Sequence, residues 1–165
     1  MISVPISVKP LARRALLRQF PFDGFAFDIS RSWIYPLVAA SLRRNSGSTP
    51  AKPATPNLVT ILLYIPDWDA QHYGYFIPQT LQANISSLLC NLERDNLCRL
   101  VCAAHLFAGV SRSAAMHHYL DKFDYDFNEI NYPQLKKHYQ RHFVHFEPQY
   151  LEDLQQLTQA KNIQN

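Results

Sequence analysis

The segment from Ala108 to Ala115 constrains the fold of this chain more than any other. An apolar helical stretch meets Gly109, and a second helix can begin two residues later behind Ser111. Glycine ends a helix well because it adopts positive φ angles without strain, and a serine N-cap accepts a hydrogen bond from a free backbone N–H. The segment therefore predicts a pair of helices within residues 97–123, namely 97–108 and 112–123, joined by a short turn.

The remaining hydrophobic patterns predict a helix-dominated α+β fold. Alternating or continuous apolar runs indicate a small antiparallel sheet of residues 2–8, 58–65 and 72–77. The last two strands are expected to form a hairpin whose turn contains Asp67 and Asp69. Five or six helices should pack against the sheet. Besides the pair above, helices are expected over residues 10–20, from Pro78 onward, and from Pro133 to about His145. A further helix should end at Leu42, and it is either kinked at Pro36 or begins near that proline.

Length and composition indicate a single domain, residues 1–165. Apolar residues make up 47% of the chain and charged residues 18%, which is typical of a folded protein with its own core. Residues 45–57, NSGSTPAKPATPN, predict a flexible loop because they combine three prolines with small polar residues. A helix at 148–162, with leucines along one side, is a candidate appendage to the domain.

A cytoplasmic location is expected from the cysteines and from the lack of a hydrophobic segment. Cys90, Cys98 and Cys102 are odd in number and crowd into one helical stretch, which argues against a disulfide framework. Arginines interrupt the N-terminal region, so it has no secretory pattern. The longest apolar run, 100–110, is too short to span a bilayer.

Charge is unevenly distributed along the chain. Residues 1–56 contain eight Lys/Arg and two Asp, a net charge of +6, whereas residues 111–147 are neutral. A basic N-terminal third suits a polyanionic partner, and a solvated basic surface explains it equally well.

The turn at Gly109 resembles that of repressor-type helix-turn-helix proteins, in which the sequence A-G-V-S-R-S recurs. The resemblance covers residues 101–120. Val110 should fill the gap between the helices. His105 and His118 depart from the pattern, because a small residue and an aliphatic residue are usual there. The resemblance implies that the start of the second helix faces a DNA groove. The side chains expected to face it are Arg112, Ser113, Met116 and His117. The alternative is an ordinary helical hairpin.

Basic residues that could hold DNA phosphates lie on two other predicted helices. Helical spacing gathers Lys136, Lys137 and Arg141 on one side of a helix whose opposite side is apolar. The first helix exposes three arginines, Arg13, Arg14 and Arg18. A plain surface helix is the alternative in each case.

A broader resemblance covers nearly the whole chain. The Tyr-Leu-x-x-Phe-x-Tyr segment at 119–125 and the Leu-Lys-Lys-x-Tyr-x-Arg segment at 135–141 look like those of small uncharacterised proteins of phages and conjugative elements of gut bacteria. That resemblance implies a role on a mobile element and brings no established activity or catalytic residues.

Two stripes of metal-binding residue types lie at helical spacing. Cys98, Cys102 and His105 form one stripe, and His138, His142 and His145 form the other. Thiolate and imidazole are zinc ligands. Core packing explains the first stripe and packing against a neighbouring element explains the second, so we expect no metal and no cofactor. No nucleophile elbow, phosphate loop or dinucleotide fingerprint is present, and we expect no enzyme activity.

These observations together predict a non-catalytic protein that binds duplex DNA, as a homodimer if it recognises paired half-sites. The alternative is a protein-interaction or assembly factor that uses the aromatic and leucine side chains of residues 143–157.

Overall fold

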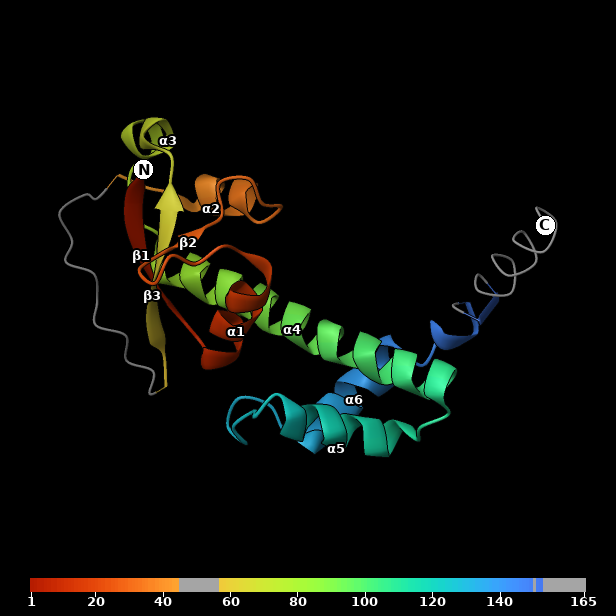
Figure 1. Ribbon diagram of the computed structural model, residues 1–165. Coiled ribbons are helices and arrows are strands. Elements are labelled where there is room, and N and C mark those ends of the chain that lie inside the picture. The colour runs from red at the N-terminus through yellow and green to blue at the C-terminus, as the bar shows by residue number, and fades with distance from the viewer. Residues whose placement is uncertain (45–56, 150, 153–165) are drawn as a thin grey trace. The chain divides into compact units, whose positions relative to one another are not determined.

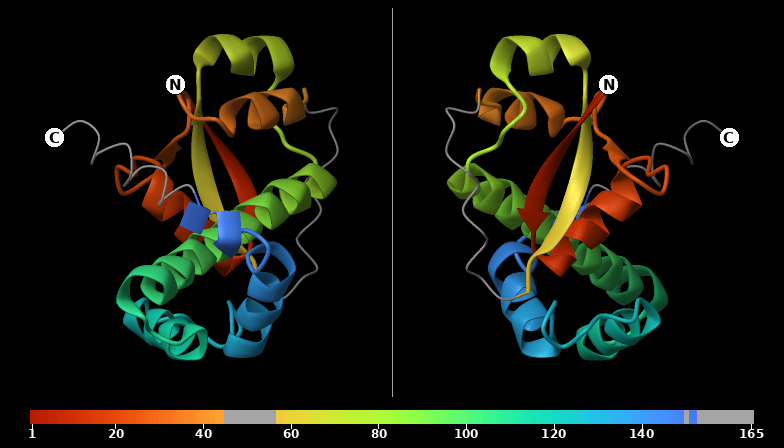
Figure 2. Two further views of the ribbon diagram at one scale, coloured as in Figure 1. Left: turned by 90° about the vertical axis from the view of Figure 1, so that its right-hand side faces the viewer. Right: turned by 90° about the vertical axis from the view of Figure 1, so that its left-hand side faces the viewer.

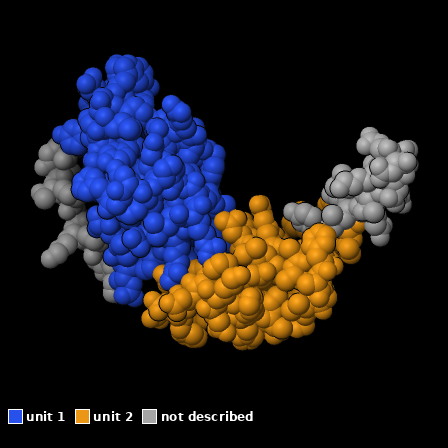
Figure 3. Space-filling model, viewed as in Figure 1, with its two compact units in different colours: residues 1–93 blue, residues 94–165 orange. Residues whose placement is uncertain are grey.

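The computed structural model describes residues 1–44, 57–149 and 151–152. The chain divides into two compact units, residues 1–93 and residues 94–165, each described here by itself (Figure 3). Residues 45–56 of the expected loop at 45–57 and most of the expected helix at 148–162 lie outside the described residues. Among the described residues, no helix combines the length and the apolar content that crossing a membrane requires.

Unit 1 contains a three-stranded sheet in the order β1–β3–β2 (Figure 1). Strand β1 (Ile2–Val8) pairs antiparallel with β3 (Val59–Ile65), from Ile2 opposite Ile65 to Val8 opposite Val59. Strand β2 (Phe27–Asp28) pairs parallel with β3 on its other side. Alternate side chains of β1 and β3 are buried on one face: Val4, Ile6, Val8, Ile61, Leu63 and Ile65.

The outer edge of β1 is closed by side chains. Pro5 has no N–H, so it cannot pair with a further strand. The N–H of Ser7 donates to Gln82 Oε1 at 2.7 Å, and the N–H of Lys9 donates to Ser86 Oγ at 2.9 Å. Both acceptors belong to α4 (Gln79–Ala108), so this helix satisfies edge groups that would otherwise attract another strand.

Prolines begin the short helices of unit 1. Pro10 occupies the first turn of α1 (Pro10–Gln19), and Pro36 occupies the first turn of α2 (Tyr35–Ser41), where a missing N–H has no cost. The helix therefore begins near Pro36 rather than being kinked there, which is one of the two possibilities that the sequence left open. Leu11 and Ala15 of α1, and Phe20 directly after it, are buried.

The predicted hairpin of residues 58–65 and 72–77 is wrong. After β3 the chain forms α3 (Asp67–Tyr73) instead of a turn. Pro66 sets the backbone for a helix start, and Asp67 and Asp69 lie in the first turn, where the helix dipole favours negative charge. The place of the missing strand beside β3 is taken by β2, so the sheet is mixed rather than antiparallel.

Unit 2 is helical in its described part. It contains the second half of α4, α5 (Arg112–Lys122) and α6 (Tyr132–His142). Its core is made of Leu97, Cys98, Val101, Cys102, Ala115, Met116, Ile130, Leu135, Tyr139 and Phe143. The expectation of two separate helices, one from Pro78 and one over 97–108, is wrong, because α4 continues through both without a break. No glycine or proline interrupts it, and the Asp95 carboxylate contacts His138 at 2.7 Å instead of capping a helix. With these corrections, the helix-dominated α+β class is confirmed.

Candidate nucleic-acid interface

The turn between α4 and α5 has the predicted backbone. Gly109 has a φ of +64°, and the N–H of Val110 donates to the carbonyl oxygen of Ala104 at 3.3 Å across the helix end. Ser111 is the N-cap of α5, and its Oγ accepts the N–H of Ala114 at 3.2 Å. Helix α5 then lies beside α6, as the views of Figure 2 show. The sequence therefore located this turn and its cap correctly.

The interior of the turn is built differently from the expectation. Val110 does not fill a gap between the helices, because 37% of its surface is exposed. His105 takes part instead: its Nδ1 lies 2.9 Å from the carbonyl oxygen of Val110. The imidazole thus ties the last turn of α4 to the residue before the cap. This contact explains why a histidine can stand where the resemblance leads one to expect a small residue.

Helix α5 buries Ala115 and Met116. The expectation that Met116 faces a DNA groove is therefore wrong: it is 3% exposed and belongs to the core of unit 2. His117 and His118 are exposed. The apolar side of α5 is narrow, so most of the helix surface remains available to a partner.

Arg112 is held by a buried carboxylate. Its Nε donates to Glu147 Oε1 at 2.8 Å, and its Nη2 donates to Glu147 Oε2. The hydroxyl of Tyr139 also donates to Glu147 Oε1, and the Cys102 thiol lies beside that hydroxyl. Glu147 is 6% exposed. This two-point pair occupies the Nε and Nη2 donors and fixes the guanidinium on Glu147, which weakens the expected role of Arg112 in recognising bases.

The contacts around Glu147 shift the pKa values of Glu147 and Tyr139. The hydrogen bond from Arg112 is the largest influence on Glu147 and holds the pKa of that carboxyl below its ordinary range, against the opposing effect of burial. Burial, followed by the hydrogen bond to Glu147, raises the pKa of Tyr139. Sequence reasoning missed this cluster because Arg112 and Glu147 are 35 residues apart and no spacing rule links them.

Tyr132, at the start of α6, joins the outer side of α5 to the basic side of α6. Its hydroxyl lies 3.0 Å from the hydroxyl of Ser113. Its ring stacks on that of His117 with centroids 4.3 Å apart, and the Nζ of Lys136 lies 5.9 Å from the ring centre. Three residues predicted to contact DNA are therefore neighbours on one surface. No pattern in the sequence indicates that Tyr132 connects them.

Lys137 and Arg141 lie further along α6, on the side of the helix away from its buried residues Leu135 and Tyr139. Both are exposed, as is Lys136, and within the described ranges none of the three forms an ion pair. We call Ser113, His117, Tyr132, Lys136, Lys137 and Arg141 the α5–α6 surface. Asp121 lies four residues after His117, so it places one carboxylate at the end of the surface on α5.

The N-terminal arginines are placed less favourably for phosphate contact. The Nε of Arg18 lies 3.0 Å from Oε1 of Glu93, whose side chain is fully buried. Arg18 therefore neutralises the buried carboxylate of Glu93, which makes it less available to a DNA phosphate. Arg13 and Arg14 are half-buried on α1, so their role as phosphate contacts remains a prediction.

The two stripes of metal-binding residue types have other contacts. Cys90, Cys98 and Cys102 are buried and form no disulfide within the described part of the chain, and burial raises the pKa of Cys98 to about 12. His138 pairs with Asp95, while its ring also lies 4.6 Å from that of His142. Among the described residues, no three side chains of metal-binding type come together as a possible metal site.

Comparison with known proteins gave no match to a protein-family model, a curated protein or a solved structure. Both resemblances noted in the sequence therefore remain predictions.

Proposed function

We propose that this protein binds duplex DNA without catalysis, through the α5–α6 surface. The observation that supports this most directly is the contact of Tyr132 with Ser113, His117 and Lys136. The same helix α6 also exposes Lys137 and Arg141. Hydroxyls, imidazoles and cationic side chains are the groups that contact phosphate and sugar oxygens in protein–DNA complexes.

The engagement of Arg112 limits what this surface can recognise. The side chain at the start of α5 best placed to contact base edges is paired with Glu147. The remaining cations, Lys136, Lys137 and Arg141, supply charge without information about sequence. The proposed binding is therefore directed at the DNA backbone and shows little preference among sequences. A cytoplasmic location, a mobile-element role and a homodimer accompany this proposal as predictions.

Single charge changes test the proposal by fluorescence anisotropy with a labelled random duplex. Lys137→Ala should weaken binding roughly fivefold or more at about 0.1 M salt, because one counterion release is lost. Asp121→Asn should strengthen binding, since it removes the carboxylate from the end of the same surface. Lys9→Ala, which removes an exposed lysine of unit 1, is the matched control and should change nothing. The proposal fails if Lys137→Ala and Lys9→Ala behave alike, or if Asp121→Asn has no effect.

An assembly role is the second candidate, and the exposure of apolar side chains after α6 favours it. Val144, Phe146 and Leu151 are 40%, 52% and 42% exposed, and apolar side chains exposed close together are a feature of interaction surfaces. An interface of this kind would make the chain self-associate, and rising salt would not weaken the association. Sedimentation at low and high salt therefore separates this candidate from DNA binding, whose affinity should fall steeply.

A further inference from the structure

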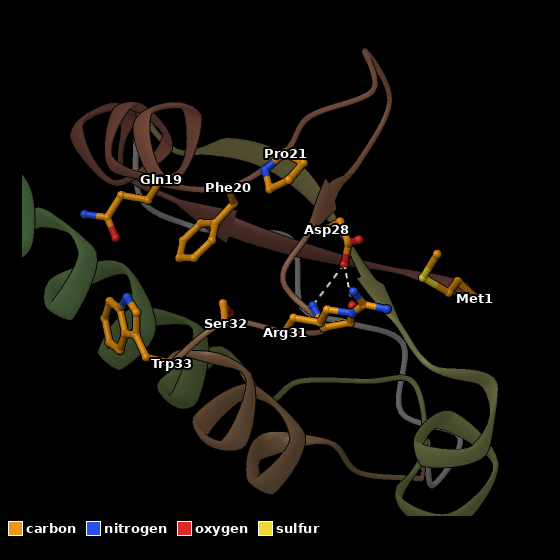
Figure 4. A pocket seen from close by; sticks show the side chains of 9 residues that line it. Met1, Gln19, Phe20, Pro21, Asp28, Arg31, Ser32 and Trp33 are labelled. Atoms are coloured by element: carbon orange, nitrogen blue, oxygen red, sulfur yellow. Dashed lines mark hydrogen bonds between the residues drawn. The ribbon is translucent and has the colours of Figure 1, made fainter.

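Unit 1 contains a pocket of about 850 Å³ that the proposed DNA-binding surface does not include. It lies where the end of α1, the end of β2 and the segment before α2 meet (Figure 4). Its volume is within the range of small-molecule sites, roughly 300–1,000 Å³. Asp28 is the last residue of β2, so its side chain lies where this strand ends at the pocket.

The walls of this pocket are divided into an apolar part and a charged part. Phe20 and Trp33 lie together on one side, whereas Asp28 and Arg31 lie together on the other (Figure 4). Trp33 is 54% exposed, which is a high value for so large an apolar residue. A ligand that matches this division carries an apolar group at one end and charges at the other.

The charged part offers one anion and one cation. Oδ1 of Asp28 accepts the N–H of Ser30 at 3.0 Å and its hydroxyl at 2.6 Å, and these bonds lower the pKa of the carboxyl. Asp28 is therefore ionised at neutral pH. Arg31 is near enough to lower that pKa further, yet within the described residues the two groups do not form an ion pair. Each keeps hydrogen-bonding capacity for a ligand.

We propose that this pocket binds a free α-amino acid with an aromatic or large aliphatic side chain. The ammonium group would contact Asp28, the carboxylate would contact Arg31, and the side chain would lie against Phe20 and Trp33. A zwitterion with an apolar side chain contacts both charged groups and both rings at once. A purely anionic or purely cationic aromatic compound contacts one charged group and is repelled by the other. The proposal is independent of DNA binding, because all of these residues lie in residues 1–93.

Fluorescence of Trp33 provides the test. The chain has two tryptophans, so the Trp68→Phe variant reports Trp33 alone. Titration with L-phenylalanine should give a saturable fluorescence change. N-acetyl-L-phenylalanine, which lacks the cation, L-phenylalanine amide, which lacks the anion, and glycine, which lacks the side chain, should each bind roughly tenfold more weakly or worse, the effect of losing one charge-assisted contact or the apolar burial.

Two pocket variants in the same background then assign the charges. Asp28→Asn should abolish the preference for phenylalanine over its N-acetyl derivative, and Arg31→Gln should abolish the preference over its amide. Circular dichroism would verify that both variants are folded. The proposal is overturned if phenylalanine produces no saturable change at millimolar concentrations, if the blocked compounds bind as well as phenylalanine, or if neither variant alters the preferences.

Discussion

Gly74→Ala is expected to destabilise unit 1 by at least about 3 kcal/mol, because the new methyl group would occupy space already filled by backbone. A Cβ built on Gly74 lies 2.1 Å from the carbonyl oxygen of Arg43 and 2.2 Å from its carbonyl carbon. The φ of Gly74 is +103°, which a residue with a side chain rarely adopts. Neither the clash nor the strain can be relieved by turning a side chain.

The backbone around Gly74 has little freedom to move away. The N–H of Arg43 donates to the carbonyl oxygen of Phe76 at 2.8 Å, and the N–H of Phe76 donates back to Arg43 at 3.2 Å. The N–H of Gly74 also closes α3 by donating to Ala70 at 2.9 Å. Relief of the clash would break this paired bridge or the end of the helix, so the loss should appear in the free energy of unfolding measured with urea.

Gly24→Ala is the matched control for Gly74→Ala. Gly24 also has a positive φ, +93°, but a Cβ at that position meets no atom within 4 Å. Its substitution should therefore cost only the backbone strain, about 1–2 kcal/mol. Equal losses for the two variants would show that the close approach at Arg43 is absent in solution.

Glu147→Ala is expected to lower the free energy of unfolding of unit 2 by about 2–3 kcal/mol, because it removes the acceptor shared by Arg112 and Tyr139. Tyr139 is 1% exposed, so its hydroxyl would lose its partner inside the core. The side chain of Arg112 is 44% exposed and can regain water, which keeps the expected loss below that of a fully buried pair. Glu152→Ala, at an exposed carboxylate nearby, should change stability by less than about 0.5 kcal/mol.

The contribution of Glu147 should also depend on pH. Its folded-state pKa is lowered by Arg112, so the folded state favours the carboxylate. The resulting stabilisation is fully present above the ordinary glutamate pKa of about 4.3, and it is lost as pH falls through the lowered folded-state value. The stability difference between the natural chain and Glu147→Gln should therefore be constant near neutral pH and shrink below about pH 4. A difference that stays constant down to pH 2 would contradict the assigned role of this carboxylate.

The parts of the fold that the sequence predicted correctly depend on local chemistry. Pro10 and Pro36 begin helices, Gly109 ends one, and Ser111 caps the next, because each effect acts within a few residues. The apolar run before Pro66 forms the central strand for the same reason. The errors concern pairing over long distances. Phe27 and Asp28 form a strand of two residues, too short for any periodicity, and their partner lies more than 30 residues away.

In the candidate site, too, local features could be predicted from the sequence and contacts between distant residues could not. Spacing alone placed Lys136, Lys137 and Arg141 on the exposed side of one helix. It could not show that Glu147 would engage Arg112, that Glu93 would engage Arg18, or that Tyr132 would bring α5 and α6 together. Met116 was assigned to the wrong side because its neighbours are small or polar, which leaves the direction of the apolar side of α5 poorly defined in sequence.

The most direct test of the central claim is the salt dependence of binding to random duplex DNA, measured for the natural chain and for a variant in which Lys136, Lys137 and Arg141 are all alanine. Each phosphate contact contributes about 0.9 to the slope of log K against log salt concentration. If the α5–α6 surface binds the DNA backbone, the triple substitution should reduce that slope by about 2.7, with unchanged thermal unfolding. Identical slopes for the two proteins, or an affinity that does not change with salt, would contradict the proposed function.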